Sequence, residues 1–277
     1  MEAAQHLLRT GRRGQMFEFV MAANDFKGSL RRLGLAWSLA SHDIVSRYRG
    51  SILGPFWITL SMGLMVLGIG FLYAQLFKIP IHDYIPFLAL GIVFFGTLTG
   101  IINEGCETFT LARSMLSQTS IPMFTFVWRT VFRNLLNLGH HMVIVAAVLV
   151  IFGTWRHANL PLALVGMLFL LLNASWLSML AAIASARFRD IPPVVMSIMQ
   201  FAIFMTPVFW KPDTFPERHV VLVLNPFAHM LNAVRGPLLG THVPELTWIV
   251  LTLMAVLGWA ITFGLFAVTR RRIVHYL

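Results

Sequence analysis

Charged residues are scarce in this chain, and six long stretches contain no Asp, Glu, Lys or Arg. Only 12% of the 277 residues are charged and 57% are hydrophobic, whereas soluble domains are about 25% charged. The uncharged stretches are Ser51–Phe77, Tyr84–Asn103, Asn134–Thr154, Asn159–Ala186, Ile191–Trp210 and Leu246–Thr269. Each is long enough for an α-helix to cross a hydrocarbon core, which takes about 20 residues. Because lipid offers backbone amides no hydrogen-bond partner, we expect an all-α integral membrane protein.

Catalytic and metal-binding patterns are also missing. The chain contains no G-x-x-x-x-G-K-[ST] phosphate loop, and its one cysteine, Cys106, excludes an intrachain disulfide and a multi-cysteine metal site. Glu104 and Glu107 share one helix face, but no nucleophile or metal motif accompanies them. We therefore expect structural pairing with Arg129 or Arg133 instead of catalysis, and we expect no enzyme activity, metal or cofactor on this chain.

Six transmembrane helices are predicted at about residues 51–77, 84–104, 131–154, 159–186, 191–210 and 246–269. They belong to a single domain, residues 28–277, which follows a cytoplasmic tail of residues 1–27. The tail is polar and rich in Gly and Arg, so we expect it to be poorly ordered.

Residues 28–46 carry the pattern of an amphipathic helix. Leu30, Leu33, Trp37 and Ile44 recur at helical spacing, with polar residues on the other faces. Because the first predicted span begins a few residues later, we expect this helix to lie in the cytoplasmic membrane interface. The alternative is an ordinary soluble helix.

Residues 211–245 contain several prolines and predict an outer hairpin between the fifth and sixth spans. The apolar part, His219–Val234, is too short to cross the membrane and is divided at Asn225-Pro226. This pattern favours a re-entrant helical hairpin, whose broken backbone must be buried in protein or line a water-filled cavity. A simple external loop with a short surface helix is the alternative.

The distribution of basic residues predicts the orientation. If the N-terminus lies inside and the loops alternate, five of the 21 basic residues fall outside: Lys78, Arg156, Lys211, Arg218 and Arg235. The positive-inside rule then places both termini in the cytoplasm. Topology and contacts with lipid headgroups account for most of the net charge of +10, so we expect membrane lipids and not nucleic acid as partners.

The centres of the spans carry no acid or base that would serve as an ion relay, such as secondary transporters use. His140 and His141 are the titratable pair inside a span, and adjacent helix positions point about 100° apart. Energy for transport must then come from a partner or from the gradient itself.

Four motifs, in order along residues 28–275, resemble the membrane subunits of the polysaccharide ABC exporters, which export O-antigen, capsule and teichoic acid chains. They are Arg47-Tyr48-Arg49-Gly50-Ser51 with Leu53-Gly54-Pro55-Phe56-Trp57, Arg187-Phe188-Arg189-Asp190, Thr206-Pro207-Val208-Phe209-Trp210, and Asn225-Pro226 with His229, Arg235 and Leu239-Gly240. The resemblance implies a homodimer of six-span subunits in the bacterial inner membrane. It further implies two copies of a cytoplasmic ATP-binding subunit, which would hold ATP and Mg²⁺ and would drive export of a lipid-diphosphate-linked polysaccharide.

A related ABC exporter of drugs or lipids and a passive channel remain the alternatives, together with a membrane enzyme acting on lipid-linked sugars. The last would need clustered Asp, Glu or His at one membrane face, which the sequence does not show. Transport without any ATPase partner would identify a passive channel.

Arg47 and Arg49 stand just before the first span, at the depth of the headgroups. Guanidinium groups bind phosphate oxygens bidentately, so these two residues are candidates for a cytoplasmic gate that recognises the substrate's diphosphate. Topology and anionic lipid are the alternative explanation.

Residues between spans two and three can form a short helix that Pro122 ends. The resemblance implies that this helix docks on the ATPase. The candidate coupling residues are Arg113, Ser114, Met115, Leu116, Ser117 and Gln118.

Aromatic residues in the outer halves of spans one and five are candidates for a glycan path, because sugar rings stack on aromatic faces. They are Phe71, Tyr73, Phe77, Phe201, Phe204 and Phe209. Packing in the core or against lipid is the alternative for each. Gly63, Gly68 and Gly70 would permit close helix approach at a dimer seam. In the outer hairpin, the resemblance singles out Asn225, Pro226, His229 and Arg235.

Overall fold

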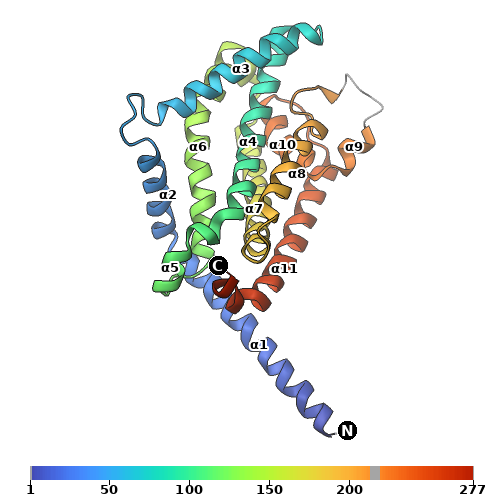
Figure 1. Cartoon of the computed structure of the whole chain (residues 1–277). Coiled ribbons are helices and arrows are strands. Elements are labelled where there is room, and N and C mark those ends of the chain that lie inside the picture. The colour runs from blue at the N-terminus through green and yellow to red at the C-terminus, as the bar shows by residue number, and fades with distance from the viewer. Residues whose placement is uncertain (1, 213–218, 277) are drawn as a thin grey trace.

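The computed structural model describes residues 2–212 and 219–276, and every regular element in these ranges is helical (Figure 1). The helices are α1 (Glu2–Leu30), α2 (Leu33–Arg47), α3 (Phe56–Leu76), α4 (Ile81–Leu111), α5 (Arg113–Gln118), α6 (Phe124–Ile151), the 3-10 turn η1 (Thr154–His157), α7 (Leu160–Arg187), α8 (Ile191–Met205), α9 (His219–Leu224), α10 (Pro226–Leu238) and α11 (Glu245–Tyr276). In Figure 1, α5 and the C-terminal end of α11 lie at one end of the bundle, and α9 and α10 lie toward the other.

Five of the described helices are long and apolar enough to cross a membrane: α3, α4, α6, α7 and α11. In the most apolar part of α4, 83% of the residues are buried inside the chain, against 22–33% in the other four helices. α4 is therefore the centre of the bundle. The other four present much of their apolar surface outward, which a lipid environment accommodates.

α8 is the short member of the predicted set of spans. It has 15 residues, about 22 Å of helix at 1.5 Å per residue, whereas the hydrocarbon core is about 30 Å thick. The helix ends because Thr206, with φ −90° and ψ 142°, is extended before Pro207, as the residue preceding a proline prefers. The predicted span 191–210 is therefore helical only as far as Met205.

The chain after α8 is buried without being helical, and side chains from other helices satisfy its carbonyl groups. Arg235 of α10 donates from Nη1 to the Pro207 carbonyl at 2.6 Å. The Tyr84 hydroxyl of α4 donates to the Phe209 carbonyl at 2.5 Å. Irregular backbone at membrane depth needs such partners, so α4 and α10 together make this segment possible.

The predicted hairpin consists of two helices, α9 and α10, separated at Asn225; residues 213–218 lie outside the described residues. The Asn225 side chain caps α10 by accepting from the Phe227 and Ala228 amides at 2.9 and 3.3 Å. α10 packs against α7 so closely that a Cβ atom on Gly166 would overlap the backbone carbonyl of Ala233. The hairpin is thus fixed to the bundle, while its depth in a membrane stays a prediction.

Residues 2–27 of the predicted tail lie within α1, which begins at Glu2. In Figure 1, its first half runs away from the bundle and its second half lies against it. Arg271 of α11 pairs with Glu18 at 2.9 Å, and Arg270 with Asp25 at 3.4 Å. These long-range ion pairs hold the helix, and composition alone could not reveal them.

α2 packs on α6 through a narrow face formed by Ala36, Ala40 and Ile44. Of the predicted apolar stripe, Ile44 is buried, whereas Trp37 is exposed and its ring meets Phe132 of α6 edge-on at 5.6 Å. The small alanines bring the two helices close enough for polar side chains to bridge them.

Candidate functional site

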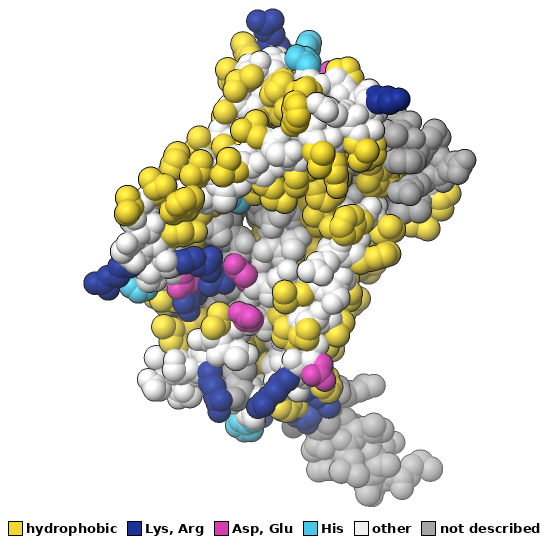
Figure 2. All heavy atoms as spheres, turned by 45° about the horizontal axis from the view of Figure 1, so that its top comes forward, with side chains coloured by type: hydrophobic (Ala, Val, Ile, Leu, Met, Phe, Trp, Pro, Cys, Tyr) yellow, Lys and Arg dark blue, Asp and Glu magenta, His cyan; other side chains and the backbone are white. Residues whose placement is uncertain are grey.

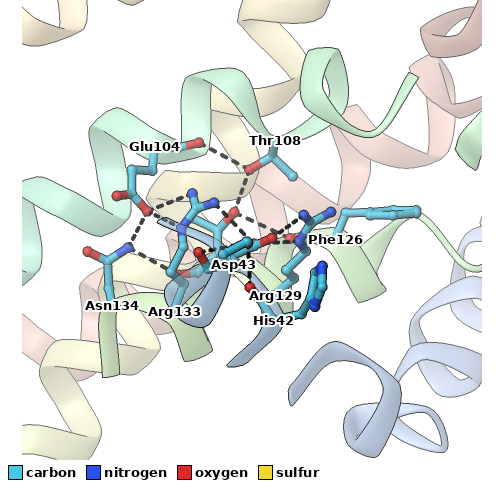
Figure 3. Close-up of polar contacts among 10 residues, drawn as sticks. His42, Asp43, Glu104, Thr108, Phe126, Arg129, Arg133 and Asn134 are labelled. Atoms are coloured by element: carbon cyan, nitrogen blue, oxygen red, sulfur yellow. Dashed lines mark hydrogen bonds and ion pairs between the residues drawn. The ribbon is translucent and has the colours of Figure 1, made fainter. Parts of the chain in front are cut away.

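A network of charged side chains joins α2 to α6 (Figure 3). Asp43 of α2 accepts two hydrogen bonds from Arg129 of α6, from Nε to Oδ2 at 2.8 Å and from Nη2 to Oδ1 at 2.6 Å. This is the bidentate geometry that makes arginine–carboxylate pairs strong. The two residues are 86 positions apart in the sequence.

The same network continues to α4. Arg133 donates from Nε to Oε2 of Glu104 at 2.8 Å and from Nη1 to Oδ2 of Asp43 at 3.3 Å. The Asn134 amide donates to the same Glu104 oxygen at 2.7 Å. Of the two partners predicted for Glu104, the structure selects Arg133, while Arg129 pairs with Asp43. Three helices thus meet at one ionic junction.

Most of the junction is shielded from solvent. The side chains of Asp43, Arg129 and Arg133 are 15%, 19% and 9% exposed. Burial alone would raise the pKa of Asp43, but the hydrogen bonds and charges of Arg129 and Arg133 outweigh it and hold the pKa below its usual value. Asp43 is therefore ionised at neutral pH. Figure 2 shows basic and acidic side chains gathered on a surface that is otherwise largely apolar.

A second carboxylate, Asp25 of α1, caps the N-terminus of α6. It accepts from the Met123 and Phe124 amides at 3.1 and 3.2 Å, and its side chain is 2% exposed. A helix N-terminus favours negative charge, and Arg270 adds a cation at 3.4 Å. Burial nevertheless dominates and raises the pKa of Asp25.

Neither Asp25 nor Asp43 was among the residues selected from the sequence. Their signal was that both are isolated acids among basic and apolar residues before the first span.

Arg47 and Arg49, the predicted diphosphate gate, lie at the exposed end of α2 and in the turn after it. Neither makes an ion pair with another side chain in the part of the chain that the structure describes. The junction lies one helical turn earlier, at Asp43. The two guanidinium groups are therefore open to an anion from outside the chain.

The six candidate coupling residues form a helix of their own, α5 (Arg113–Gln118), in which no residue is buried. Beside it lies a cavity of about 480 Å³, which is lined by residues of α4, α5, α7, α8 and α11 and of the turn after α7. Its charged lining comprises Glu107, Arg113 and Arg189. α5 is thus an exposed element next to a polar recess, at the end of the bundle that carries the C-terminus (Figure 1).

The six aromatic candidates divide into two groups. Tyr73 meets Phe77 at 5.7 Å and Phe209 at 6.0 Å between ring centroids, and Phe204 meets Phe209 at 6.2 Å. These four rings connect α3 to the segment around the end of α8. Phe71 and Phe201 stand apart from this cluster and are 56% and 65% exposed.

Two of the three glycines singled out on α3 allow close contact with other helices of the same chain. A Cβ atom on Gly63 would come 3.2 Å from Ile144 of α6, and one on Gly70 would come 3.2 Å from Ile85 of α4. Gly68 has nothing within 4 Å, so it alone of the three faces open space.

Comparison with known proteins assigns the chain to a family. Residues 35–239 match the family described as ABC-2 type transporter, which is well over half of the chain. The chain belongs to the ABC-2 type transporters. Two relatives of this ABC-2 chain carry the name O-antigen export system permease protein RfbA. The protein from Myxococcus xanthus is 25% identical over 219 residues, covering 76% of this chain and 83% of its own. The protein from Klebsiella pneumoniae is 20% identical over 202 residues, covering 71% of this chain and 77% of its own length.

The match confirms the predicted resemblance to polysaccharide ABC exporter permeases. Membership in the ABC-2 family makes the chain a multi-pass membrane protein and the membrane subunit of a transporter, not itself catalytic. Among the described residues, no group of three or more His, Cys, Asp or Glu side chains is placed to hold a metal ion.

Proposed function

We propose that this chain forms the channel of an ATP-driven exporter that moves lipid-diphosphate-linked polysaccharide from the cytoplasm across the bacterial inner membrane. The names of its two relatives support this substrate class. ATP and Mg²⁺ would bind to a separate cytoplasmic subunit, present in two copies beneath a homodimer of this chain.

α5 is the observation that supports this function most directly. It is a short helix without a buried residue between two long apolar ones, α4 and α6, and it lies at the same end as the C-terminus. A partner that pushes on α5 acts directly on the central helix α4 and on α6, whose ionic junction reaches α2. Movement of the partner would then reach Arg47 and Arg49.

The proposed crossing segments are α3, α4, α6, α7, α11 and, as the sixth, α8 continued by the buried segment after it. Both termini, α5 and the end of α2 then lie on the cytoplasmic side, and α9 and α10 lie outside. Arg47 and Arg49 would bind the diphosphate of the entering substrate, since both guanidinium groups are exposed and lack ion pairs among the described side chains. The aromatic rings of α3 and α8 would line the glycan path.

The homodimer is proposed because α3 and α8 leave apolar side chains uncovered. Phe71 of α3 and Phe201 of α8 are more than half exposed, and Gly68 leaves space for a second helix to approach. Lipid also covers such surfaces, so crosslinking between protomers at α3 is the direct check.

Purification of the tagged chain with the ATPase encoded beside it tests the function. We expect a complex whose ATP hydrolysis rises when lipid-linked glycan is added. Stimulation by drugs or simple lipids but not by glycan would identify the related exporter class. Failure of any ATPase to co-purify, with transport intact, would identify a passive channel.

Single cysteines test α5 as the docking element. In a Cys106→Ser background, Ser114→Cys and Ser117→Cys should crosslink to the ATPase, because both positions are exposed on α5. Thr241→Cys, exposed beyond α10, is the matched control and should not react. Crosslinks at Thr241→Cys with none on α5 would reverse the proposed orientation.

A further inference from the structure

A cavity of about 360 Å³ lies beside the hairpin, toward the end of the bundle opposite α5. Its walls come from the segment after α8, from α9 and α10, and from the start of α11. This volume falls within the range of about 300–1,000 Å³ that small-molecule sites occupy. Neither the charged junction nor α5 belongs to it.

Arg235 of α10 lines this cavity and is a buried cation without a carboxylate partner. The residue is 4% exposed, and no acidic side chain in the described ranges 2–212 and 219–276 lies within ion-pair distance of it. Its guanidinium carbon sits 3.9 Å from the centre of the Phe87 ring. Buried charges are normally paired, because taking an ion out of water is costly.

The guanidinium group has donors to spare. Nη1 donates to the Pro207 carbonyl at 2.6 Å, and the described residues provide no other hydrogen-bond acceptor for its side chain. A guanidinium group carries five N–H donors. Burial lowers the pKa of Arg235 to about 9, so the group is still a cation at pH 7 and attracts an anion into the cavity.

The rest of the lining combines polar and apolar side chains. Asn232 lies one turn from Arg235 on α10, and its amide makes no hydrogen bond to another described residue. His229 is already engaged, since its ring nitrogens meet Thr247 Oγ1 at 3.0 Å and the Val223 carbonyl at 2.9 Å. The lining also contains apolar side chains, including Leu222 and Leu246.

We propose that the cavity binds the phosphate group of an amphipathic molecule, with Arg235 and Asn232 as its ligands and the apolar walls against the hydrocarbon part. Guanidinium and phosphate fit one another in a bidentate, charge-assisted geometry. The arrangement supplies the anion that Arg235 lacks. The same chemistry could come from a phospholipid headgroup or from free phosphate, and the test distinguishes the two.

Binding is measured on delipidated protein in a neutral detergent, by thermal shift and by native mass spectrometry. The probes are phosphatidylglycerol, diacylglycerol and inorganic phosphate. We expect phosphatidylglycerol to bind wild type, and Arg235→Gln to weaken one binding event at least about tenfold, as the loss of a charge-assisted contact implies. Asn232→Leu should weaken the same event while leaving the Arg235 contacts in place. Arg156→Gln, a surface arginine over Trp155, is the control with equal charge change and should bind as wild type does.

If inorganic phosphate alone gives the same thermal shift in wild type as phosphatidylglycerol does, and no shift in Arg235→Gln or Asn232→Leu, the ligand is free phosphate. Equal binding of diacylglycerol and phosphatidylglycerol would overturn the phosphate site. Unchanged binding of phosphatidylglycerol to Asn232→Leu would also overturn the phosphate site. This variant serves as the test if Arg235→Gln fails to fold. Glu217 lies outside the described residues. Stronger binding of phosphatidylglycerol to Glu217→Gln than to wild type would show that the chain's own carboxylate occupies the site, and would overturn the proposal.

Discussion

Substitution of Asp43 by Asn is the most direct way to test the ionic junction. The change removes one charge and keeps the shape of the side chain, but it sets an amide N–H₂ against the guanidinium of Arg129. Asp43 now accepts hydrogen bonds at 2.8 and 2.6 Å from Arg129 and at 3.3 Å from Arg133. Hydrogen bonds to charged groups contribute about 1.5–3 kcal/mol each, and Asn retains one acceptor, so we expect a loss of about 2–4 kcal/mol.

The loss is measured as thermal unfolding of the detergent-purified chain, followed by tryptophan fluorescence. At about 2–4 °C per kcal/mol for a chain of this order of size, the midpoint should fall by about 4–16 °C. Asp83→Asn is the matched control, since its ion pair with His82 is exposed, with side chains 58% and 69% accessible. Exposed pairs contribute about 0–1 kcal/mol, so the control should stay close to wild type.

A double-mutant cycle identifies the partner. Asp43→Asn combined with Arg129→Gln should cost less than the sum of the single changes, by at least about 1 kcal/mol, because the two residues share the lost contact. Additive losses would mean that the pair does not form. The dependence of stability on pH in acid is a second test of the pair. The pKa of Asp43 is lowered in the folded chain, so its contribution is full above the unfolded value near 3.9 and disappears as the pH falls through the folded value.

Two further pairs of substitutions test the cap that α1 provides for α6 and the packing of α10 on α7. Asp25→Ala should lower the free energy of unfolding by about 1–2 kcal/mol through loss of the α6 cap. Asp25→Asn should stay nearer wild type, because it keeps an acceptor and burial already disfavours the charge. Equal thermal midpoints for the two variants would contradict the capping role. Gly166→Ala should lower the free energy of unfolding by about 1–3 kcal/mol, because the new Cβ overlaps Ala233. Gly68→Ala, with no atom within 4 Å of its Cβ, should be neutral or up to about 1 kcal/mol stabilising. A thermal midpoint for Gly166→Ala at or above that of Gly68→Ala would refute the close contact.

Local patterns predicted much of this architecture. Uncharged length identified five long helices, and the segment before Pro122 predicted a short helix, which the structure shows as α5 ending at Gln118. Arg129 and Arg133 were the partners expected for Glu104 and Glu107, and the structure shows the pair Glu104–Arg133.

Contacts between distant segments were beyond such reasoning. Asp43 meets Arg129 across 86 residues and Asp25 meets Phe124 across 99, so nothing in either local sequence names the partner. Composition likewise gives no sign of the ion pairs that Glu18 and Asp25 form with α11.

The end of α8 was predictable in part. Thr206-Pro207 marks a helix boundary, yet the absence of charge through Trp210 favoured a longer span. Tyr84 of α4 and Arg235 of α10 stabilise the non-helical backbone there, because they donate hydrogen bonds to its carbonyl groups.

That path has a consequence for the order of biosynthesis. Tyr84, which serves the Phe209 carbonyl, is translated before the segment it supports, but Asn225 and Arg235, which serve Thr206 and Pro207, are translated after it. When α8 leaves the ribosome, part of its outer end therefore has no protein partner. The fifth segment can reach its final position only once the ribosome has made α10, so insertion of this region is completed backward along the chain.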